Sequence, residues 1–266
     1  MSISSVFIAS PRSLRSSQAV TADGPLSTAH LPRPDPARGV FETLLVVDGS
    51  PVELDAHLDR LAASVRELFG APTMARVAGP ARLLAEARAH ELPLGRLRVT
   101  LAPDGQGRLD LTAVTADVDP ITVFPSAGHV PELAPVTVAG GLGGHKWADR
   151  RLLDQAAATL DGALPLLVDA DGTALETERA SLFLVRDDTL TTPSADGRIL
   201  PGIARARVIA IARELGIDVS ERSIQLTELE SADEVFLTGS VRGVEPVRTG
   251  PIAARLSGEL RRRWRA

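Results

Sequence analysis

The stretch Gly140-Gly-Leu-Gly-Gly-His-Lys146-Trp-Ala-Asp-Arg150 contains the single lysine of a 266-residue chain that carries 28 arginines. Arginine cannot replace lysine where a deprotonated primary amine is needed, because its guanidinium group stays charged. A lysine that acts as a nucleophile or forms a Schiff base has that need. Lys146 is therefore the first candidate for a catalytic residue. The alternative is a surface lysine that has persisted by chance.

The glycines before Lys146 look at first like a phosphate-binding loop. The spacing of a nucleotide-binding P-loop is absent, since Trp147 follows the lysine where Ser or Thr is required. The pattern favours instead a flexible connection between a strand at Val136–Ala139 and a helix from Trp147 to about Leu160. Such a connection lets Lys146 reach inward.

The composition excludes several classes of protein. The chain has no cysteine, which excludes disulfides, thiolate catalysis and cysteine-bound metals. A net charge of -5 argues against a general nucleic-acid binder. There is no run of 18 apolar residues that could span a membrane, and residues 1–20 lack the apolar core of a signal peptide. We therefore expect a cytoplasmic protein with no metal site and with neither nucleic acid nor membrane as partner.

The order of strands and helices predicts an α+β fold with two lobes, because no regular βαβ rhythm is present. We expect a smaller α+β domain at residues 1–116, of which 1–37 are partly irregular. A linker rich in Pro, Gly and Asp follows at 117–131, and a larger α+β domain at 132–266.

Local patterns place the individual elements. Val40–Val47 is a β-branched run that ends at Asp48-Gly49 and predicts a hairpin with Pro51–Leu54. Asp55 is expected to cap a helix that Gly70 ends. Further strands are predicted at Ser5–Ala9, Arg96–Leu101, Arg108–Val114, Pro165–Val168, Ser181–Val185 and Glu234–Leu237, and further helices at Val77–His90, Ile203–Leu215 and 251–265.

Six segments in a fixed order carry a family resemblance. They resemble the class IV (fold-type IV) pyridoxal-phosphate enzymes, which include branched-chain and D-amino acid aminotransferases and, as the most similar member, 4-amino-4-deoxychorismate lyase. The segments are Gly39-Val-Phe-Glu-Thr43, His57-Leu-Asp-Arg60-Leu, His145-Lys146-Trp-Ala-Asp-Arg150, Leu175-Glu176-Thr-Glu-Arg-Ala-Ser-Leu-Phe183, Leu200-Pro-Gly-Ile-Ala-Arg205 and Leu237-Thr-Gly-Ser240-Val-Arg-Gly.

The resemblance implies a cofactor, pyridoxal 5'-phosphate (PLP), held between the two lobes. Lys146 matches the family's Schiff-base lysine, and Glu176 matches the carboxylate that faces the pyridine nitrogen. An anion at that place raises the pKa of the nitrogen and makes the ring a better electron sink.

The resemblance also implies which residues hold the phosphate. Arg60 matches a family arginine, and Ser240 matches a family hydroxyl. The backbone N–H groups of Ile203 and Ala204 open a helix whose positive end suits an anion. The family often has Thr where this chain has Ala204.

On the substrate side the resemblance implies Thr43, Arg150, Val241 and Arg242 as contacts for a small amino-bearing carboxylate. The alternative for the two arginines is that they form structural ion pairs with Asp149 or Glu245. The family also implies a homodimer.

Two features favour the lyase over an aminotransferase. The family's aminotransferases commonly place a tyrosine five residues after the Schiff-base lysine, whereas this chain has no tyrosine at all. In its place stands Lys146-Trp-Ala-Asp149-Arg150, which is similar to the lyases that release pyruvate and 4-aminobenzoate, a folate precursor. The second feature is Thr238-Gly-Ser-Val-Arg-Gly243, which resembles a version seen in lyases, where Arg242 would offer a partner to one of the two carboxylates of aminodeoxychorismate. A branched-chain or D-amino acid aminotransferase is the alternative. A non-catalytic binding subunit is a third hypothesis, which the retention of Lys146 and Glu176 disfavours.

Overall fold

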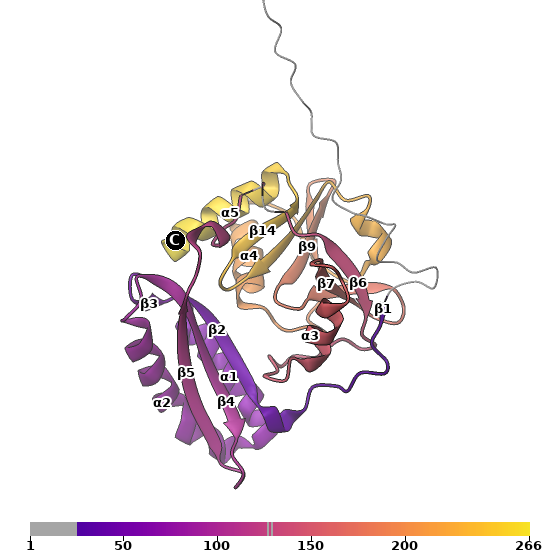
Figure 1. The fold of residues 1–266 in the computed structure, drawn as a ribbon. Helices are drawn as coiled ribbons and strands as arrows, with labels where there is room; N and C mark the ends of the chain where they lie inside the picture. The colour runs from indigo at the N-terminus through magenta and orange to yellow at the C-terminus, as the bar shows by residue number, and fades with distance from the viewer. Residues whose placement is uncertain (1–25, 127, 129) are drawn as a thin grey trace, which may run out of the picture.

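The computed structural model describes residues 26–126, 128 and 130–266, and the side chains of 71–77 are not described. Two β-sheets, each with its own helices, lie side by side (Figure 1). The strand predicted at Ser5–Ala9 lies outside the described residues. The mixed α+β fold class is confirmed.

The small-sheet unit spans residues 40–117 and consists of four strands in the order β3-β2-β4-β5, with two helices on one face (Figure 1). The predicted hairpin is confirmed: Asp48 and Gly49 join β2 to β3 with φ of 48° and 72°, the conformation of a type I′ turn. Its second strand is Ser50–Pro51 rather than the predicted Pro51–Leu54, because Leu54 already begins a helix. The elements are β2 (Val40–Val47), β3 (Ser50–Pro51), α1 (Leu54–Phe69), α2 (Ala71–Ala89), β4 (Leu94–Pro103) and β5 (Leu109–Asp117).

Two predicted helix starts in this unit were wrong. Helix α1 begins after Glu53, which has a left-handed φ of 55°, and Asp55 lies in the first turn, where its carboxylate accepts a hydrogen bond from Arg82. Helix α2 begins at Ala71, before the predicted Val77. A proline in its first turn is tolerated there, because the N–H that proline lacks would have no helical partner anyway.

The large-sheet unit contains ten strands in one mixed sheet, with three longer helices around it. The sequence prediction missed several short strands, among them β8, which carries Glu176. The elements are β1 (Leu26–Ser27), β6 (Leu133–Thr137), α3 (Arg151–Ala158), β7 (Leu164–Val168), β8 (Thr173–Thr177), β9 (Ser181–Arg186), β10 (Thr189–Thr192), α4 (Ile203–Glu214), β11 (Val219–Glu221), β12 (Ile224–Gln225), β13 (Glu234–Gly239), β14 (Gly243–Arg248) and α5 (Pro251–Trp264), with single 3-10 turns at Pro36–Arg38, Pro120–Thr122 and Leu226–Leu229.

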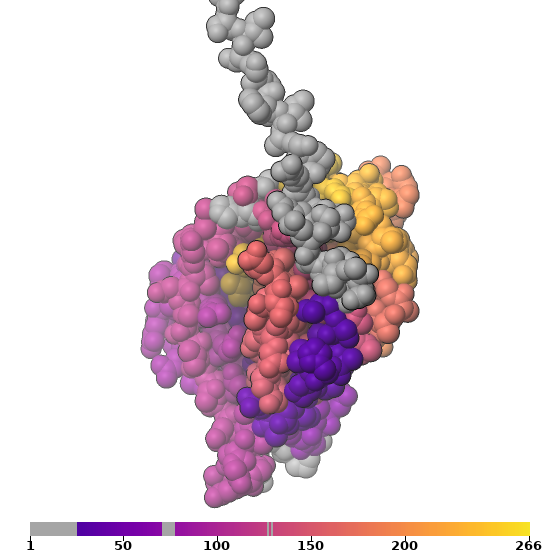
Figure 2. All heavy atoms as spheres, turned by 45° about the vertical axis from the view of Figure 1, so that its right-hand side comes forward, coloured from indigo at the N-terminus to yellow at the C-terminus, as the bar shows by residue number. Residues whose placement is uncertain are grey.

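The N-terminal segment at residues 26–38 runs over the large-sheet unit. Its strand β1 pairs in parallel with β6, and the Arg33 guanidinium donates to the carbonyls of Ala139 and Gly141. In Figure 2 the indigo atoms of this segment lie against the coral atoms of the large-sheet unit. Leu26–Ser27 thus lies with the larger sheet, although the sequence prediction assigned residues 1–116 to the smaller domain. The remaining domain boundaries stay a prediction.

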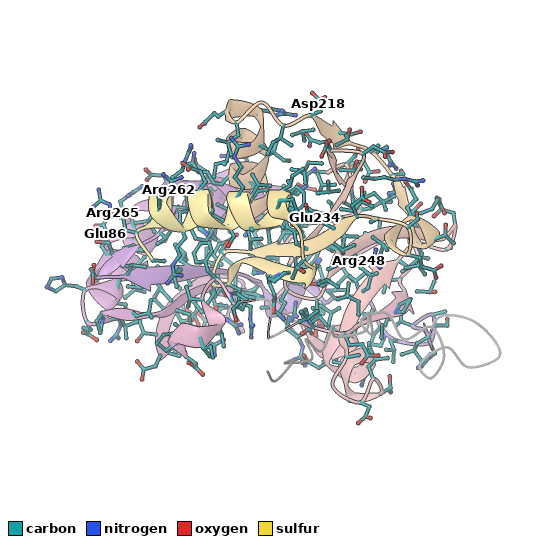
Figure 3. All side chains as sticks on the ribbon, turned by 90° about the horizontal axis from the view of Figure 1, so that it is seen from above. Glu86, Asp218, Glu234, Arg248, Arg262 and Arg265 are labelled. Atoms are coloured by element: carbon teal, nitrogen blue, oxygen red, sulfur yellow. The ribbon has the colours of Figure 1, made fainter. Side chains whose placement is uncertain are left out.

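The C-terminal helix α5 is fastened to the sheet by a buried carboxylate. Glu234 on β13 accepts hydrogen bonds from the backbone N–H groups of Ile252 and Ala253 at 2.9 and 2.7 Å. Figure 3 shows Glu234 beside the first turn of this helix. The carboxylate therefore satisfies N–H groups that a helix start leaves without an intrahelical partner.

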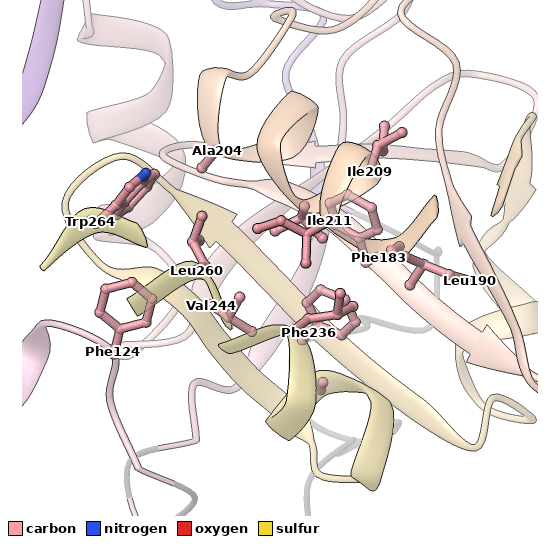
Figure 4. Close-up of a cluster of buried hydrophobic side chains, with 14 of the residues drawn as sticks. Phe124, Phe183, Leu190, Ala204, Ile209, Ile211, Phe236, Val244, Leu260 and Trp264 are labelled. Atoms are coloured by element: carbon pink, nitrogen blue, oxygen red, sulfur yellow. The ribbon is translucent and has the colours of Figure 1, made fainter. Parts of the chain in front are cut away.

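The aromatic side chains of the large-sheet unit fix the linker between the two sheets. Phe183 and Phe236 stack at 5.1 Å between ring centroids, and Phe124 of the linker meets Trp264 of α5 edge-on at 5.8 Å (Figure 4). Phe124 also covers Gly243, where a Cβ atom would lie 2.3 Å from the ring. The linker therefore packs against the turn between β13 and β14.

Within the described residues, no helix is long and apolar enough to cross a membrane.

Candidate active site

A pocket of about 470 Å³ lies between the two sheets and takes lining residues from both. This volume is within the range of sites for small ligands and cofactors. All ten residues that the sequence singled out line this one pocket. They are Thr43, Arg60, Lys146, Arg150, Glu176, Ile203, Ala204, Ser240, Val241 and Arg242.

Backbone pairing with the small sheet fixes the place of Lys146. The carbonyl of Lys146 accepts from the N–H of Phe41 at 2.9 Å, and the N–H of Ala148 donates to the carbonyl of Gly39 at 3.0 Å. The helix predicted from Trp147 therefore begins only at Arg151, because residues 146–148 are extended along the start of β2. The reactive amine is thereby held where the two units meet.

The surroundings of Lys146 lower the pKa of its amine. Burial, and then the positive charge of Arg60, lower its pKa from 10.5 to about 8, although Glu42 and Glu176 act in the opposite direction. The residue is partly exposed by surface area, and this exposure is toward the pocket that it lines. Its Nζ lies 5.1 Å from the centroid of the Phe41 ring. About a tenth of the amine is therefore unprotonated at pH 7, far more than for an ordinary lysine.

Glu176 presents a buried carboxyl to the same pocket from the end of β8. Its burial raises the pKa to about 7, and the N–H of Leu200, which donates to Oε1 at 3.1 Å, opposes this shift. A buried carboxyl of this kind is suited to share a proton with a basic ring nitrogen, because each partner stabilises the charged form of the other.

Arg60 reaches the pocket from α1. Glu42 on β2 accepts from its Nε at 2.8 Å and from its Nη2 at 2.6 Å, and the carbonyl of Pro201 accepts from Nη1 at 2.8 Å. The contact with Pro201 crosses from the small-sheet unit to the start of α4. Arg60 therefore lies next to the helix end that the sequence predicted as a phosphate site.

The first turn of α4 leaves backbone N–H groups facing the pocket. Gly202 precedes the helix and offers no side-chain cap. A Cβ atom at this position would lie 2.5 Å from Oγ of Ser181, so the two segments approach closely here. Ile203, Ala204 and Ser240 line the pocket beside Arg60. This set of donors at a helix N-terminus suits a phosphate group.

Both arginines that the sequence predicted as substrate contacts have partners within the protein. Arg242 is paired with the buried Glu245 at 3.1 Å, which also holds Arg179 at 2.7 Å. Arg150 donates to the carbonyl of Glu178 at 2.9 Å, and its Nη2 lies 3.6 Å from the Glu178 carboxylate. Of the structural ion pairs considered as the alternative, the pair between Arg242 and Glu245 is therefore present. Asp149 instead binds Arg151 at 2.6 Å.

The sequence prediction missed the pocket wall formed by β4. Arg96 and Arg98 alternate along this strand and line the pocket, and in the described part of the chain neither has a carboxylate within ion-pair distance. Arg98 lies over the Phe41 ring at 4.3 Å, and burial, then Arg96 and Arg150, lower its pKa. Two buried hydroxyls of the pocket, on Thr43 and Thr238, also have no hydrogen-bond partner there. The alternation of arginine with apolar residues along β4 is the sequence pattern from which these two arginines could have been predicted to share one face of the strand.

Comparison with known proteins places this geometry in a family. The family model for class IV amino-transferases matches residues 39–249. The chain belongs to that family. Its members depend on PLP, so PLP is the cofactor that these residues must accommodate. The lysine, the buried carboxyl and the donors at α4 fit the aldehyde, the ring nitrogen and the phosphate of PLP.

Individual relatives support the same fold. Mitochondrial branched-chain-amino-acid aminotransferase 1 from Arabidopsis thaliana is 37% identical over 125 residues, which are 45% of this chain and 33% of that protein. The matched segment thus spans about a third of that relative. The structure of 4-amino-4-deoxychorismate lyase from Pseudomonas aeruginosa is 24% identical with a TM-score of 0.70, over 85% of this chain and 91% of that one.

A second solved structure is a hypothetical aminotransferase from Mycobacterium tuberculosis in a form with bound α-ketoglutarate and PMP. It is 24% identical with a TM-score of 0.69, over 84% of this chain and 88% of that one. At these identities the two structures show that the fold is that of fold-type IV PLP enzymes.

Proposed function

We propose that this class IV enzyme is a 4-amino-4-deoxychorismate lyase-like enzyme that releases pyruvate and 4-aminobenzoate. The supporting observation is the wall formed by β4, where Arg96 and Arg98 line the pocket without a carboxylate partner among the described residues. A substrate with two carboxylates supplies the missing anions, and paired arginines bind carboxylates strongly. Both arginines are exposed, so an apolar branched side chain would gain nothing from these guanidinium groups, whereas a carboxylate would.

We further propose a role for each residue of the cofactor side. Bound PLP supplies an electron sink for charge that develops at the carbon bearing the substrate amino group. Arg60, the first turn of α4 and Ser240 hold the phosphate, and Glu176 holds a proton at the ring nitrogen. Lys146 attaches the cofactor, and its free amine then moves the proton at the substrate carbon.

The neighbourhood of Lys146 favours the lyase in a second way. The position five residues after the lysine is Arg151, whose guanidinium is bound to Asp149 and which lies in the first turn of α3. The chain contains no tyrosine that could take the place of the phenol common in the aminotransferases. Once the substrate's ring carbon that bears the amino group has lost its proton, the enolpyruvyl group departs and the ring becomes aromatic. The stability of the aromatic ring of 4-aminobenzoate then drives the reaction.

An aminotransferase is the second candidate, and one observation favours it. The Arabidopsis thaliana relative that is 37% identical over 125 residues is a branched-chain-amino-acid aminotransferase. An aminotransferase that uses a dicarboxylic keto acid as acceptor would also have a use for Arg96 and Arg98.

A product assay decides between the two candidates. The purified chain with PLP is given 4-amino-4-deoxychorismate in one set of reactions, and L- or D-amino acids with a keto acid in the other. We expect 4-aminobenzoate and pyruvate in equal amounts, without need of a keto acid. Turnover that depends on a keto acid and releases no 4-aminobenzoate would contradict the lyase proposal.

The family also leads us to propose a homodimer, which light scattering of the purified protein would test.

A further inference from the structure

Glu42 is a buried carboxylate beside the proposed cofactor site, and the roles assigned above do not use it. It lies on β2 with 2% of its side chain exposed and faces α1, whereas its neighbours Phe41 and Thr43 line the pocket. Neighbouring residues of a strand point to opposite faces of the sheet. Glu42 therefore acts from behind the pocket wall rather than within the pocket.

Three hydrogen bonds occupy the Glu42 carboxylate. Oε1 accepts from Nε of Arg60, and Oε2 accepts from Nη2 of Arg60 and lies 2.7 Å from Nδ1 of His57. His57 and Arg60 are three residues apart on α1 and therefore share one face of the helix. A carboxylate that binds two N–H groups of one guanidinium fixes the plane of that group.

The donors left on Arg60 are the ones available to a ligand. A guanidinium has five N–H groups. Glu42 takes two of them and the Pro201 carbonyl takes a third. Two N–H groups remain, on a side chain that lines the pocket beside the first turn of α4. By binding Arg60, Glu42 thus fixes the direction in which the two remaining N–H groups of the guanidinium point.

The charge of Glu42 also acts on the reactive amine. Burial alone would raise the pKa of Glu42, but the charge of Arg60 and the hydrogen bonds with His57 and Arg60 lower it to about 2, so the group is ionised in any working condition. Arg60 lowers the pKa of Lys146, and Glu42 raises it. The carboxylate therefore offsets part of the repulsion between two cations that share the pocket.

We propose that Glu42 is a positioning residue that turns Arg60 toward the cofactor phosphate and balances the positive charge of Arg60, which shares the pocket with Lys146. The proposal rests on the cofactor site proposed above. It makes two separable predictions, one for the affinity of PLP and one for the pH at which the bound chromophore changes its absorbance.

The test uses Glu42→Gln, which keeps the shape of the side chain and removes its charge. We expect the dissociation constant of PLP, measured by equilibrium dialysis, to rise about 10- to 100-fold, the usual effect of removing a group that orients a ligand-binding residue. Loss of a nearby negative charge disfavours the cationic form, so the absorbance titration of the cofactor bound to Lys146 should move to lower pH.

Two further variants show whether Glu42 acts through Arg60. In the Arg60→Gln protein, adding Glu42→Gln should change the PLP dissociation constant little, because groups that act as a unit are not additive. Glu42→Asp retains the charge on a shorter side chain. It should weaken PLP binding while leaving the titration midpoint near that of the unchanged protein, and it serves as the second variant if Glu42→Gln does not fold.

Glu234→Gln is the matched control, because Glu234 is also buried but binds the backbone of α5 and does not line the pocket. It should change neither the dissociation constant nor the titration. The inference is overturned if Glu42→Gln or Glu42→Asp binds PLP as the unchanged protein does, or if the effects of Glu42→Gln and Arg60→Gln simply add. If the unchanged protein shows no absorbance that depends on Lys146, the cofactor site itself is wrong, which is a different result.

Discussion

The two sides of the pocket differ in how their charges are satisfied. On the side predicted to hold the cofactor, Arg60 is fixed by Glu42, and Glu176 accepts a hydrogen bond from the backbone N–H of Leu200. On the side formed by β4, Arg96 and Arg98 have no carboxylate partner within the described residues. Both arginines are exposed, so their guanidinium groups are open to an anion from outside the protein. The side predicted to hold the cofactor thus has its charged groups bound to protein partners, and we propose that the β4 side receives the charges of a substrate.

The largest expected effect comes from removing the amine on the cofactor side. Lys146→Arg keeps a positive charge but cannot attach PLP. We expect loss of the absorbance band of the bound cofactor and a fall in turnover of roughly 10²–10⁴-fold, the contribution of a group that transfers protons. Absorbance spectra and steady-state rates measure the two effects. A Lys146→Arg protein that keeps the band would remove the basis of the comparison.

The pH dependence of cofactor capture is the next effect in size. With a pKa of about 8, Lys146 has roughly 10% of its amine unprotonated at pH 7, against about 0.04% for a lysine with a pKa near 10.4. The rate at which cofactor-free protein captures PLP should therefore rise with pH and level off above pH 8. Stopped-flow absorbance measures this rate. A rate that still rises steeply at pH 10 would show that the amine is an ordinary one.

The β4 side is tested by removing its charges. Arg98→Gln and Arg96→Gln should each raise KM for a substrate with two carboxylates by roughly 10- to 100-fold, as expected for the loss of a charged hydrogen bond. PLP affinity should stay unchanged, because neither residue belongs to the predicted phosphate site. If both variants instead bind PLP more weakly while KM for the substrate stays unchanged, the β4 side binds the cofactor and our assignment of the two sides of the pocket is wrong.

The smallest expected effect is at Arg242, which the sequence predicted as a substrate contact. Its pairing with Glu245 leaves less of its charge for a ligand. We expect Arg242→Gln to raise KM by less than about five-fold, the usual scale for a partly exposed ion pair. A KM increase as large as that of Arg98→Gln would show that substrate displaces Glu245 from Arg242.

The ten residues that the sequence predicted for the site line the pocket, and each of them lies inside one of the six motifs. The order of the six motifs brought out Lys146, Glu176 and Ser240, and all three line the same pocket. Their roles stay predictions. The hairpin at Asp48-Gly49 was also predictable, since its turn depends on two adjacent residues.

What could not be predicted depends on contacts between distant parts of the chain. The apolar spacing after Lys146 favours a helix, but pairing with residues 39–41 keeps the first part of it extended. Glu42 was part of a quoted motif, yet its partners lie on α1 and no local pattern indicates them. The arginines of β4 alternate visibly in the sequence, but their meaning depends on which face of the strand meets the pocket.

The hydrogen bond between the Lys146 carbonyl and the Phe41 N–H has a consequence for the order of folding. Contacts between distant segments form late, because a long loop must close before they are made. Until the two sheets meet, Lys146 lacks the enclosure that lowers its pKa and is an ordinary lysine. A partly folded or newly made chain therefore has little tendency to capture an aldehyde. We therefore expect the amine to acquire its lowered pKa only when the pocket around it is complete.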